Sequence, residues 1–238
     1  MIIAFILISF VANAFDSRHS PTVAQECAMI LGEHPLFDVK EIEPGIFHLA
    51  FKKARDLTET FMRFQEHYES PKFRGQHFSR SVYKDWYRTQ NKGHFTYHKD
   101  WAGFNIPSYV LDAFFDGKFK NLTKKEQDLL NLFRNHKGRY YIIGTSGGDI
   151  ADLRHEIAHA RYYLNEEYRA LMEKAVESSD TSELRKWLLE CGYTEEVLID
   201  EVHAYLLDPA NAPKKCPVSQ YGELSLRLKA IQQKIFPL

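Results

Sequence analysis

Residues 154–163, RHEIAHARYY, contain two histidines four positions apart, and a glutamate directly follows the first. If the segment is helical, His155 and His159 lie one turn apart on the same face, because an α-helix advances about 100 degrees per residue. Two imidazoles in this arrangement can bind one Zn²⁺, and a glutamate beside the first can take a proton from a metal-activated water. The pattern therefore predicts His155 and His159 as metal ligands and Glu156 as a general base.

A catalytic zinc site uses three protein ligands and leaves one position open for water, so a third ligand must come from another element. The best source is the segment EEVLIDEVHAYLL, in which Glu201 stands among apolar residues at helical spacing. A buried carboxylate is costly unless a cation or a hydrogen-bonding group lies opposite it. We therefore expect Glu201 to be the third ligand, with His203 and then Asp200 as the alternatives.

A second pattern, G-x-S-x-G, overlaps this region at Gly144-Thr145-Ser146-Gly147-Gly148. Between a strand and a helix it can form the nucleophile elbow of a serine hydrolase. An α/β-hydrolase needs further parallel strands after the elbow, whereas the following 90 residues show helical periodicity. A hydrolase that uses Ser146 is therefore the less favoured hypothesis, and these residues are better interpreted as the turn before the histidine-bearing helix.

The elements that must position the candidate ligands follow from the pattern of the C-terminal half. RYYIIGTS predicts a strand by its β-branched and aromatic content, GGD predicts a loop, and Asp149 can cap the helix IADLRHEIAHARYYL. Leu153, Ile157, Ala160 and Leu164 form an apolar stripe on this helix, on a different line from the histidines. The segments EEYRALMEKAVESS, SELRKWLLECG, EEVLIDEVHAYLL and ELSLRLKAIQQKIF predict further helices.

The N-terminal half predicts shorter elements. FDVKEIEPGIFHLAF indicates two strands around a turn at Pro44-Gly45, and ARDLTETFMRFQEHYES places apolar residues at helical spacing. In GHFTYHKDWAGFNIPS we expect a short strand over residues 95–97. NLTKKEQDLLNLF predicts a helix that begins with a capping box, in which Thr123 is the N-cap and Glu126 stands three residues later.

Composition places the chain among globular proteins. With 44% hydrophobic and 26% charged residues among 238, it can bury one sizeable core. A formal net charge of -1 gives no basic footprint for nucleic acid. The predicted fold class is α+β: a small mixed or antiparallel sheet, with a mainly helical C-terminal half that carries the HExxH helix. Residues 15–238 are predicted to form a single domain.

The first 14 residues allow two interpretations. MIIAFILISFVANAF is an apolar run of signal-peptide length that includes an A-x-A cleavage pattern at residues 12–14, but it lacks a positive start. A signal peptide and a buried apolar segment both account for it, so export and a cytoplasmic location stay open as alternatives. The run is shorter than the roughly 20 apolar residues that span a membrane, and we expect no stable span.

HEIAH on a helix that follows a strand, with a candidate glutamate 46 positions after His155, resembles the zincin metallopeptidases and their gluzincin branch. The resemblance implies that His155, His159 and Glu201 bind Zn²⁺ and that Glu156 is the general base. It also implies that YYIIGT is an edge strand, along which a peptide substrate can lie by backbone pairing. Its coverage is about residues 139–207.

The sequence departs from several longer motifs that contain HExxH. Glycine is absent where the metzincin motif HExxHxxGxxH requires it, and Tyr205 stands where some gluzincins have the aspartate of ExxxD. Asp152, one turn before His155, is a candidate carboxylate for holding a histidine tautomer. The deformylase pattern also fails, because Cys27 is the nearest cysteine upstream of the motif.

These residues together favour a zinc-dependent hydrolase, in particular a metallopeptidase that cleaves peptide bonds with a zinc-activated water. The oxyanion then needs a donor besides zinc, for which Tyr205 is the first candidate and His203 and Tyr163 are the others. The alternative from another class is a non-catalytic metal-binding or interaction protein on the same scaffold. In that case His203 could close the metal site as a fourth ligand.

Overall fold

The computed structural model describes residues 29–101, 103–146 and 150–237. The predicted signal peptide or apolar segment at residues 1–14 lies outside this range. Among the described residues, no helix has the length and apolarity needed to cross a bilayer.

The strands are β1 (Met29–Glu33), β2 (Phe37–Glu43), β3 (Ile46–Phe51), β4 (Gly103–Pro107) and β5 (Tyr141–Ser146). The helices of the N-terminal half are α1 (Ala54–Glu69), α2 (Arg80–Gln90), α3 (Tyr97–Asp100), α4 (Asp112–Phe115) and α5 (Lys124–Phe133). The later helices are α6 (Ile150–Leu164), α7 (Glu166–Glu177), α8 (Ser182–Glu190), α9 (Leu198–Leu207) and α10 (Gly222–Ile235). Short 3₁₀ turns lie at Ser108–Leu111, Glu195–Val197, Pro209–Asn211 and Pro217–Tyr221.

The strands form one mixed sheet in the order β1-β2-β3-β5-β4. β2 and β3 form the predicted hairpin, and Gly45 at its turn has φ +77°, a conformation that glycine adopts without strain. β3 pairs in parallel with β5, and β4 pairs antiparallel with β5. The strand YYIIGT therefore lies inside the sheet, so its expected place at the edge is wrong. The edge strand beside it is β4.

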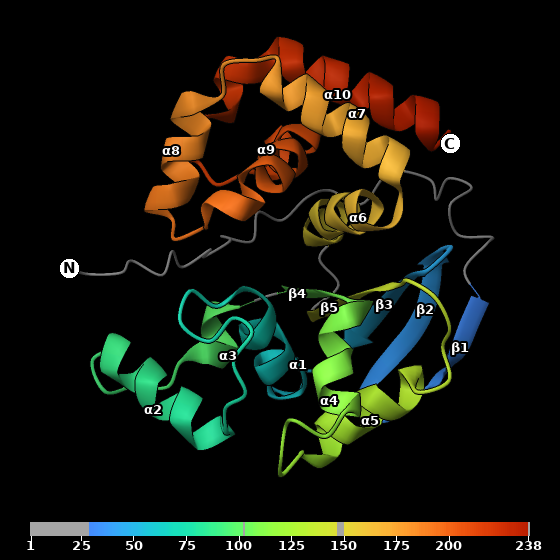
Figure 1. The fold of residues 1–238 in the computed structure, drawn as a ribbon, viewed down its shortest axis with the longest axis vertical. Coiled ribbons are helices and arrows are strands. Elements are labelled where there is room, and N and C mark those ends of the chain that lie inside the picture. The colour runs from blue at the N-terminus through green and yellow to red at the C-terminus, as the bar shows by residue number, and fades with distance from the viewer. Residues whose placement is uncertain (1–28, 102, 147–149, 238) are drawn as a thin grey trace, which may run out of the picture.

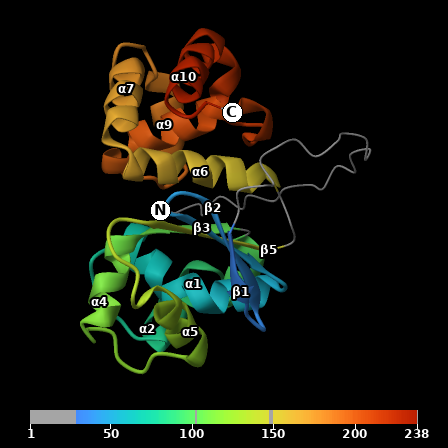
Figure 2. The same ribbon diagram turned by 90° about the vertical axis from the view of Figure 1, so that its right-hand side faces the viewer.

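The main core lies between one face of the sheet and the helices α1 to α5. Leu57, Phe61 and Phe64 of α1 are buried there, at the helical spacing that the sequence predicted. The capping box of Thr123 and Glu126 is also confirmed at the start of α5. Figure 2 shows these helices on the side of the sheet opposite α6.

The strand expected at residues 95–97 is wrong, because Tyr97 begins the short helix α3. The Tyr97 ring is buried against Tyr83, Tyr87 and Phe104, and its hydroxyl donates to Glu66 Oε1 at 2.7 Å. The aromatic residues of this segment thus fill the core, and their strand propensity is overridden by tertiary packing.

The helix that carries the HExxH motif, α6, covers the other face of the sheet (Figures 1 and 2). Its predicted apolar stripe packs there: Ala160 is fully buried, and Leu153, Ile157 and Leu164 contact the same cluster as Ile143 of β5. The expected N-cap, Asp149, lies outside the described residues. Because the stripe faces the sheet, the line of histidines on α6 is left to face a different neighbour.

That neighbour is α9. Together α6 to α10, residues 150–237, form a helical lobe, which has its own core. The sheet lobe, by contrast, consists of the described residues between 29 and 146. Figure 1 shows α9 in the middle of the helical lobe, beside α6. The predicted fold class is therefore confirmed: α+β, with a mixed sheet and a mainly helical C-terminal half.

Candidate metal centre

The three expected ligands meet between α6 and α9. Ligand atoms of His155, His159 and Glu201 all lie within 4.8 Å of one another. His155 Nε2 is 3.1 Å from His159 Nε2, and the two carboxylate oxygens of Glu201 lie 3.7 Å and 3.6 Å from these nitrogens. The structure thus brings Glu201, rather than Asp200 or His203, to the Nε2 atoms of both histidines.

The spacing of these atoms fits a tetrahedral metal ion. In a tetrahedral site, zinc bonds of about 2.0–2.2 Å to nitrogen and oxygen place neighbouring ligand atoms about 3.3–3.6 Å apart, close to the distances found here. Glu201 Oε2 is buried and has no hydrogen-bond partner in the described chain. Burial lowers the pKa of His159, yet the carboxylates of Asp200 and Glu201 raise it well above its usual range. The site therefore favours a positive charge at this point.

Asp200 supports the cluster from outside it. Its Oδ1 lies 2.9 Å from His159 Nδ1, the ring nitrogen opposite the one that faces Glu201, and 3.2 Å from His203 Nδ1. Burial would raise the pKa of Asp200, but His159 and His203 hold it well below its usual range. A carboxylate at Nδ1 fixes the tautomer in which Nε2 is free to bind metal. Asp152 was expected in this role, but its side chain is not among those that the structure describes.

His203 does not join the metal cluster. Its ring is fully buried and stacks on Tyr162 at 4.9 Å, and its Nδ1 lies 2.5 Å from the carbonyl oxygen of Asp200. Its Nε2 is buried without a hydrogen-bond partner in the described chain. The arrangement therefore gives no support to His203 as a fourth ligand that would close the site.

Glu156 projects from the same helix toward the edge strand β4. Asn105 of β4 donates a hydrogen bond from Nδ2 to Glu156 Oε2, and Asn105 Oδ1 accepts one from Tyr141 at 2.5 Å. Burial raises the pKa of Glu156, while His155, His159 and the bond from Asn105 oppose this rise. A carboxylate with a raised pKa is suited to accepting and returning a proton near neutral pH.

The candidate oxyanion donors lie at different distances from this cluster. The Tyr205 ring lies 4.7 Å from that of His155, and its hydroxyl is 3.3 Å from the Tyr193 hydroxyl. Burial raises the pKa of Tyr205, so its phenol stays protonated and can donate. Tyr163 also lines the cavity described below, whereas His203 does not. Tyr205 therefore has the more direct contact with a candidate ligand.

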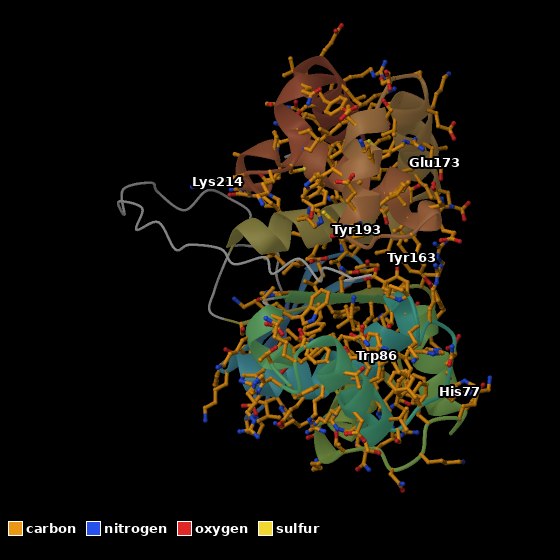
Figure 3. The ribbon with its side chains drawn as sticks, turned by 90° about the vertical axis from the view of Figure 1, so that its left-hand side faces the viewer. His77, Trp86, Tyr163, Glu173, Tyr193 and Lys214 are labelled. Atoms are coloured by element: carbon orange, nitrogen blue, oxygen red, sulfur yellow. The ribbon has the colours of Figure 1, made fainter. Side chains whose placement is uncertain are left out.

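A cavity of about 530 Å³ opens onto the cluster. His155, Glu156, His159 and Glu201 all line it, together with β4, the end of α1 and the segment after α8. Figure 3 shows Tyr163 and Tyr193 at the level where the sheet lobe and the helical lobe meet. A metal bound by the three ligands would therefore keep an open side toward this cavity.

Ser146, the nucleophile of the alternative hydrolase hypothesis, is the last residue of β5. Within residues 150–237 the chain forms helices and no further strand. Among the described contacts, Ser146 makes no hydrogen bond with a histidine; His48 Nε2 instead lies 2.8 Å from the hydroxyl of Thr145. Among the residues that the structure describes, none is therefore hydrogen-bonded to Ser146 as a general base.

Sequence reasoning missed Asn105 as a neighbour of Glu156 and placed Asp200 only as a third choice of ligand. The segment GFNIP carries a weak signal for Asn105, because Phe104 and Ile106 on either side of it are buried while Asn105 is not. This alternation marks a strand with one polar face. No spacing rule links residue 105 to residue 156.

Comparisons of the chain with protein-family models, with curated proteins and with solved structures found no match. The chemistry of the centre is therefore argued from its own geometry: two histidines one turn apart, a glutamate from a neighbouring helix, a hydrogen-bonded glutamate beside them and an open cavity.

Proposed function

We propose that the protein is a zinc-dependent hydrolase, and specifically a metallopeptidase. The observation that carries the proposal is the meeting of His155, His159 and Glu201 at tetrahedral spacing on the wall of an open cavity. Two histidines and one carboxylate form a ligand set found in catalytic zinc sites, which keep an open position. The form of the non-catalytic alternative that holds a structural metal needs a closing fourth ligand, and the position of His203 does not support it in that role.

The residues around the ligands support a hydrolytic reaction. A zinc ion bound there would supply Lewis-acid activation of water and of a carbonyl group. Glu156 would take the proton of the attacking water and return it to the leaving amine. Asn105 holds the Glu156 carboxylate on the side of β4, and Tyr205 would donate a hydrogen bond to the developing oxyanion.

The edge strand supports a peptide as the substrate. β4 lies at the end of the sheet and, in the described chain, pairs on one side only, with β5. Its residues 103–105 line the cavity, and Asn105 contacts Glu156 directly. An extended peptide can add to such an edge by backbone hydrogen bonds, and this places its carbonyl groups along the catalytic cluster.

Peptide cleavage tests the proposal. Zinc-loaded protein is incubated with a mixed peptide library, and products are identified by mass spectrometry. We expect cleavage that a chelator abolishes and that Glu156→Gln reduces by about 10³-fold, because the base is lost while the ligands stay in place. Glu167→Gln, at an exposed position on α7, is the matched control and should cleave like the wild type. Full activity of Glu156→Gln would contradict the mechanism.

A further inference from the structure

Beside the metal centre, the last two turns of α1 bring a second polar group to the same cavity. Glu69, the final residue of α1, and Gln65, one turn earlier, both line it. Gln65 Nε2 donates a hydrogen bond of 2.7 Å to Glu69 Oε2. The pair belongs to the sheet lobe, so it faces the catalytic cluster from the other side of the cavity.

Gln65 has an unused acceptor. Its side chain is 5% exposed, and its Oε1 is buried and has no hydrogen-bond partner in the described chain. Buried polar atoms in folded proteins are nearly always paired, because an unpaired one loses its hydration without compensation. The Gln65 oxygen is therefore an acceptor that a donor from outside the chain could satisfy, at a residue that lines the cavity.

Glu69 also lacks a cation. Among the described residues, no lysine or arginine forms an ion pair with it. Arg74 and Arg169 line the cavity, but Arg74 pairs with Glu196 at 3.6 Å and Arg169 with Glu166 at 3.9 Å. Glu69 is outside the cluster of three candidate ligands, so a metal bound by that cluster would not supply Glu69 with a directly bound cation.

The local electrostatics favour a positively charged ligand at this place. Burial raises the pKa of the Glu69 carboxyl to about 8, and the negative charges of Glu201, Glu156 and Asp200 act in the same direction. The carboxyl-terminal end of α1 adds the negative end of a helix dipole. A cation beside Glu69 would offset these repulsions and keep its carboxylate ionised.

We propose that Glu69 and Gln65 form a subsite for a primary ammonium group of the substrate, placed across the cavity from the metal centre. An ammonium offers three donors from one nitrogen, enough for the Glu69 carboxylate and the free Gln65 oxygen together. The rings of Tyr68 and Tyr109, which also line the cavity, pack edge to face at 6.1 Å and add aromatic surface that a cation favours. The role in substrate selection rests on the proposed peptidase function, but the binding site itself does not.

A peptide carries this chemistry in two places, its free amino terminus and its lysine side chains. Two matched pairs of probes separate them. Phenylalaninamide and N-acetylphenylalaninamide differ in the α-ammonium, and Nα-acetyl-lysinamide and Nα-acetyl-norleucinamide differ in the side-chain ammonium. Trp101 and Trp187 line the cavity, so binding is followed by tryptophan fluorescence and confirmed by calorimetry. The full chain carrying Glu156→Gln, loaded with zinc, is used so that no probe is hydrolysed.

The charged member of one pair should bind on the order of tenfold more tightly than its neutral partner, as expected for a charge-assisted hydrogen bond. A preference in the first pair identifies the amino terminus, and one in the second pair identifies lysine. Adding Glu69→Gln should remove the preference, and Gln65→Met should weaken it. Glu196→Gln is the control, because Glu196 lines the same cavity with a side chain that is 67% exposed, and it should leave the preference within about twofold.

Equal affinity within both pairs would overturn the subsite, even if the protein cleaves peptides. A preference that survives Glu69→Gln would also overturn it, because the ammonium would then be bound elsewhere. Conversely, a preference for the charged probe that depends on Glu69 would support the subsite even if no peptide in a library were cleaved. The failure of this inference and the failure of the peptidase proposal are thus separate results.

Discussion

Two neighbouring residues of α9 contact the candidate metal centre in different ways. Glu201 faces the Nε2 atoms of His155 and His159, whereas Asp200 reaches the Nδ1 atom of His159. A helix turns about 100 degrees between successive residues, so adjacent carboxylates approach one imidazole from different sides. In the proposed metal site, one short segment of the chain, DE, would thus supply both a ligand and its supporting carboxylate.

Asp200→Asn should weaken zinc binding without removing a ligand. Loss of a carboxylate that orients a metal-binding histidine typically costs 10- to 100-fold in affinity, and we expect a loss of about that size. Competition with a chromophoric chelator measures the change. Asp85→Asn, at an exposed position on α2, is the control. If Asp200→Asn bound zinc as tightly as the control, Asp200 would have no supporting role.

Asn105 donates a hydrogen bond to Glu156, the proposed general base, and a pH profile tests the effect of this bond. Asn105→Ala removes a hydrogen bond that lowers the pKa of Glu156, so that pKa should rise. Since Glu156 acts as a base when ionised, the acidic limb of kcat/KM should move to higher pH, and its maximum should fall on the order of tenfold. Zinc content should not change. An unshifted acidic limb would show that the bond to Glu156 does not tune the reaction.

At the scale of elements, local patterns predicted what depends on near neighbours in the chain. The hairpin around Gly45, the capping box of α5, and the helices α1 and α6 were predicted correctly, because turn residues, caps and apolar spacing are local signals. The internal place of β5 was missed, since its pairing with β4 joins segments far apart in the chain. The strand expected at 95–97 failed for the same reason.

As with the elements, the sequence predicted the part of the candidate site that patterns within one segment reveal, and it missed the part that depends on packing between segments. His155, Glu156 and His159 follow from a spacing rule within one helix, and Glu201 follows from a carboxylate on an apolar stripe. The neighbours Asn105 and Asp200 depend on how β4 and α9 pack against α6. Only the folded chain brings these side chains together.

Close packing of α1 on β5 should not tolerate a side chain at Gly144. A Cβ there would lie 2.6 Å from Phe61 Cε2 and 2.8 Å from Leu57 Cδ1. We expect Gly144→Ala to lower the free energy of unfolding by about 1–3 kcal/mol, the usual cost of overpacking a core. Urea denaturation measures it. Gly222→Ala is the control, because nothing lies within 4 Å of its added Cβ. Equal stability of the two variants would contradict this packing.

At the scale of the whole molecule, the sheet lobe and the helical lobe have separate cores, and the cavity lies where they meet. The candidate ligands come from α6 and α9 of the helical lobe, whereas Asn105, Glu69 and Gln65 come from the sheet lobe. In the proposed function, metal binding would therefore depend mainly on the helical lobe, whereas substrate recognition would require both lobes.

A buried ion pair in the sheet lobe allows the stability of that lobe to be tested separately from zinc binding. Arg63 and Glu126 lie in the sheet lobe at 1% and 0% exposure and share two hydrogen bonds of 2.7 Å. Glu126→Gln leaves the Arg63 charge without its partner, so we expect a loss of about 3–5 kcal/mol of unfolding free energy at pH 7. Zinc stoichiometry should be unchanged. A loss of zinc in this variant would contradict the separation of the lobes.

The Arg63–Glu126 pair should also affect how the stability of the folded protein changes at acidic pH. Burial raises the pKa of Glu126, but its hydrogen bonds and the charges of Arg63 and Arg80 outweigh this and hold it below its usual range. The stabilisation is therefore present above the unfolded-state pKa of about 4.3 and is lost as the pH falls through the lower folded-state value. Urea midpoints of the wild type and Glu126→Gln should converge below about pH 4. A constant difference down to pH 2 would contradict this linkage.

If His155, His159 and Glu201 bind one zinc ion, as we propose, the metal content of the protein should show it. Elemental analysis of the purified protein, after reconstitution with zinc and removal of the excess, should give one zinc per chain. His159→Ala and Glu201→Ala should each lose it, while Glu156→Gln should retain it, because Glu156 is not a ligand. A wild-type chain without zinc after reconstitution, or full zinc content in both ligand variants, would contradict the account.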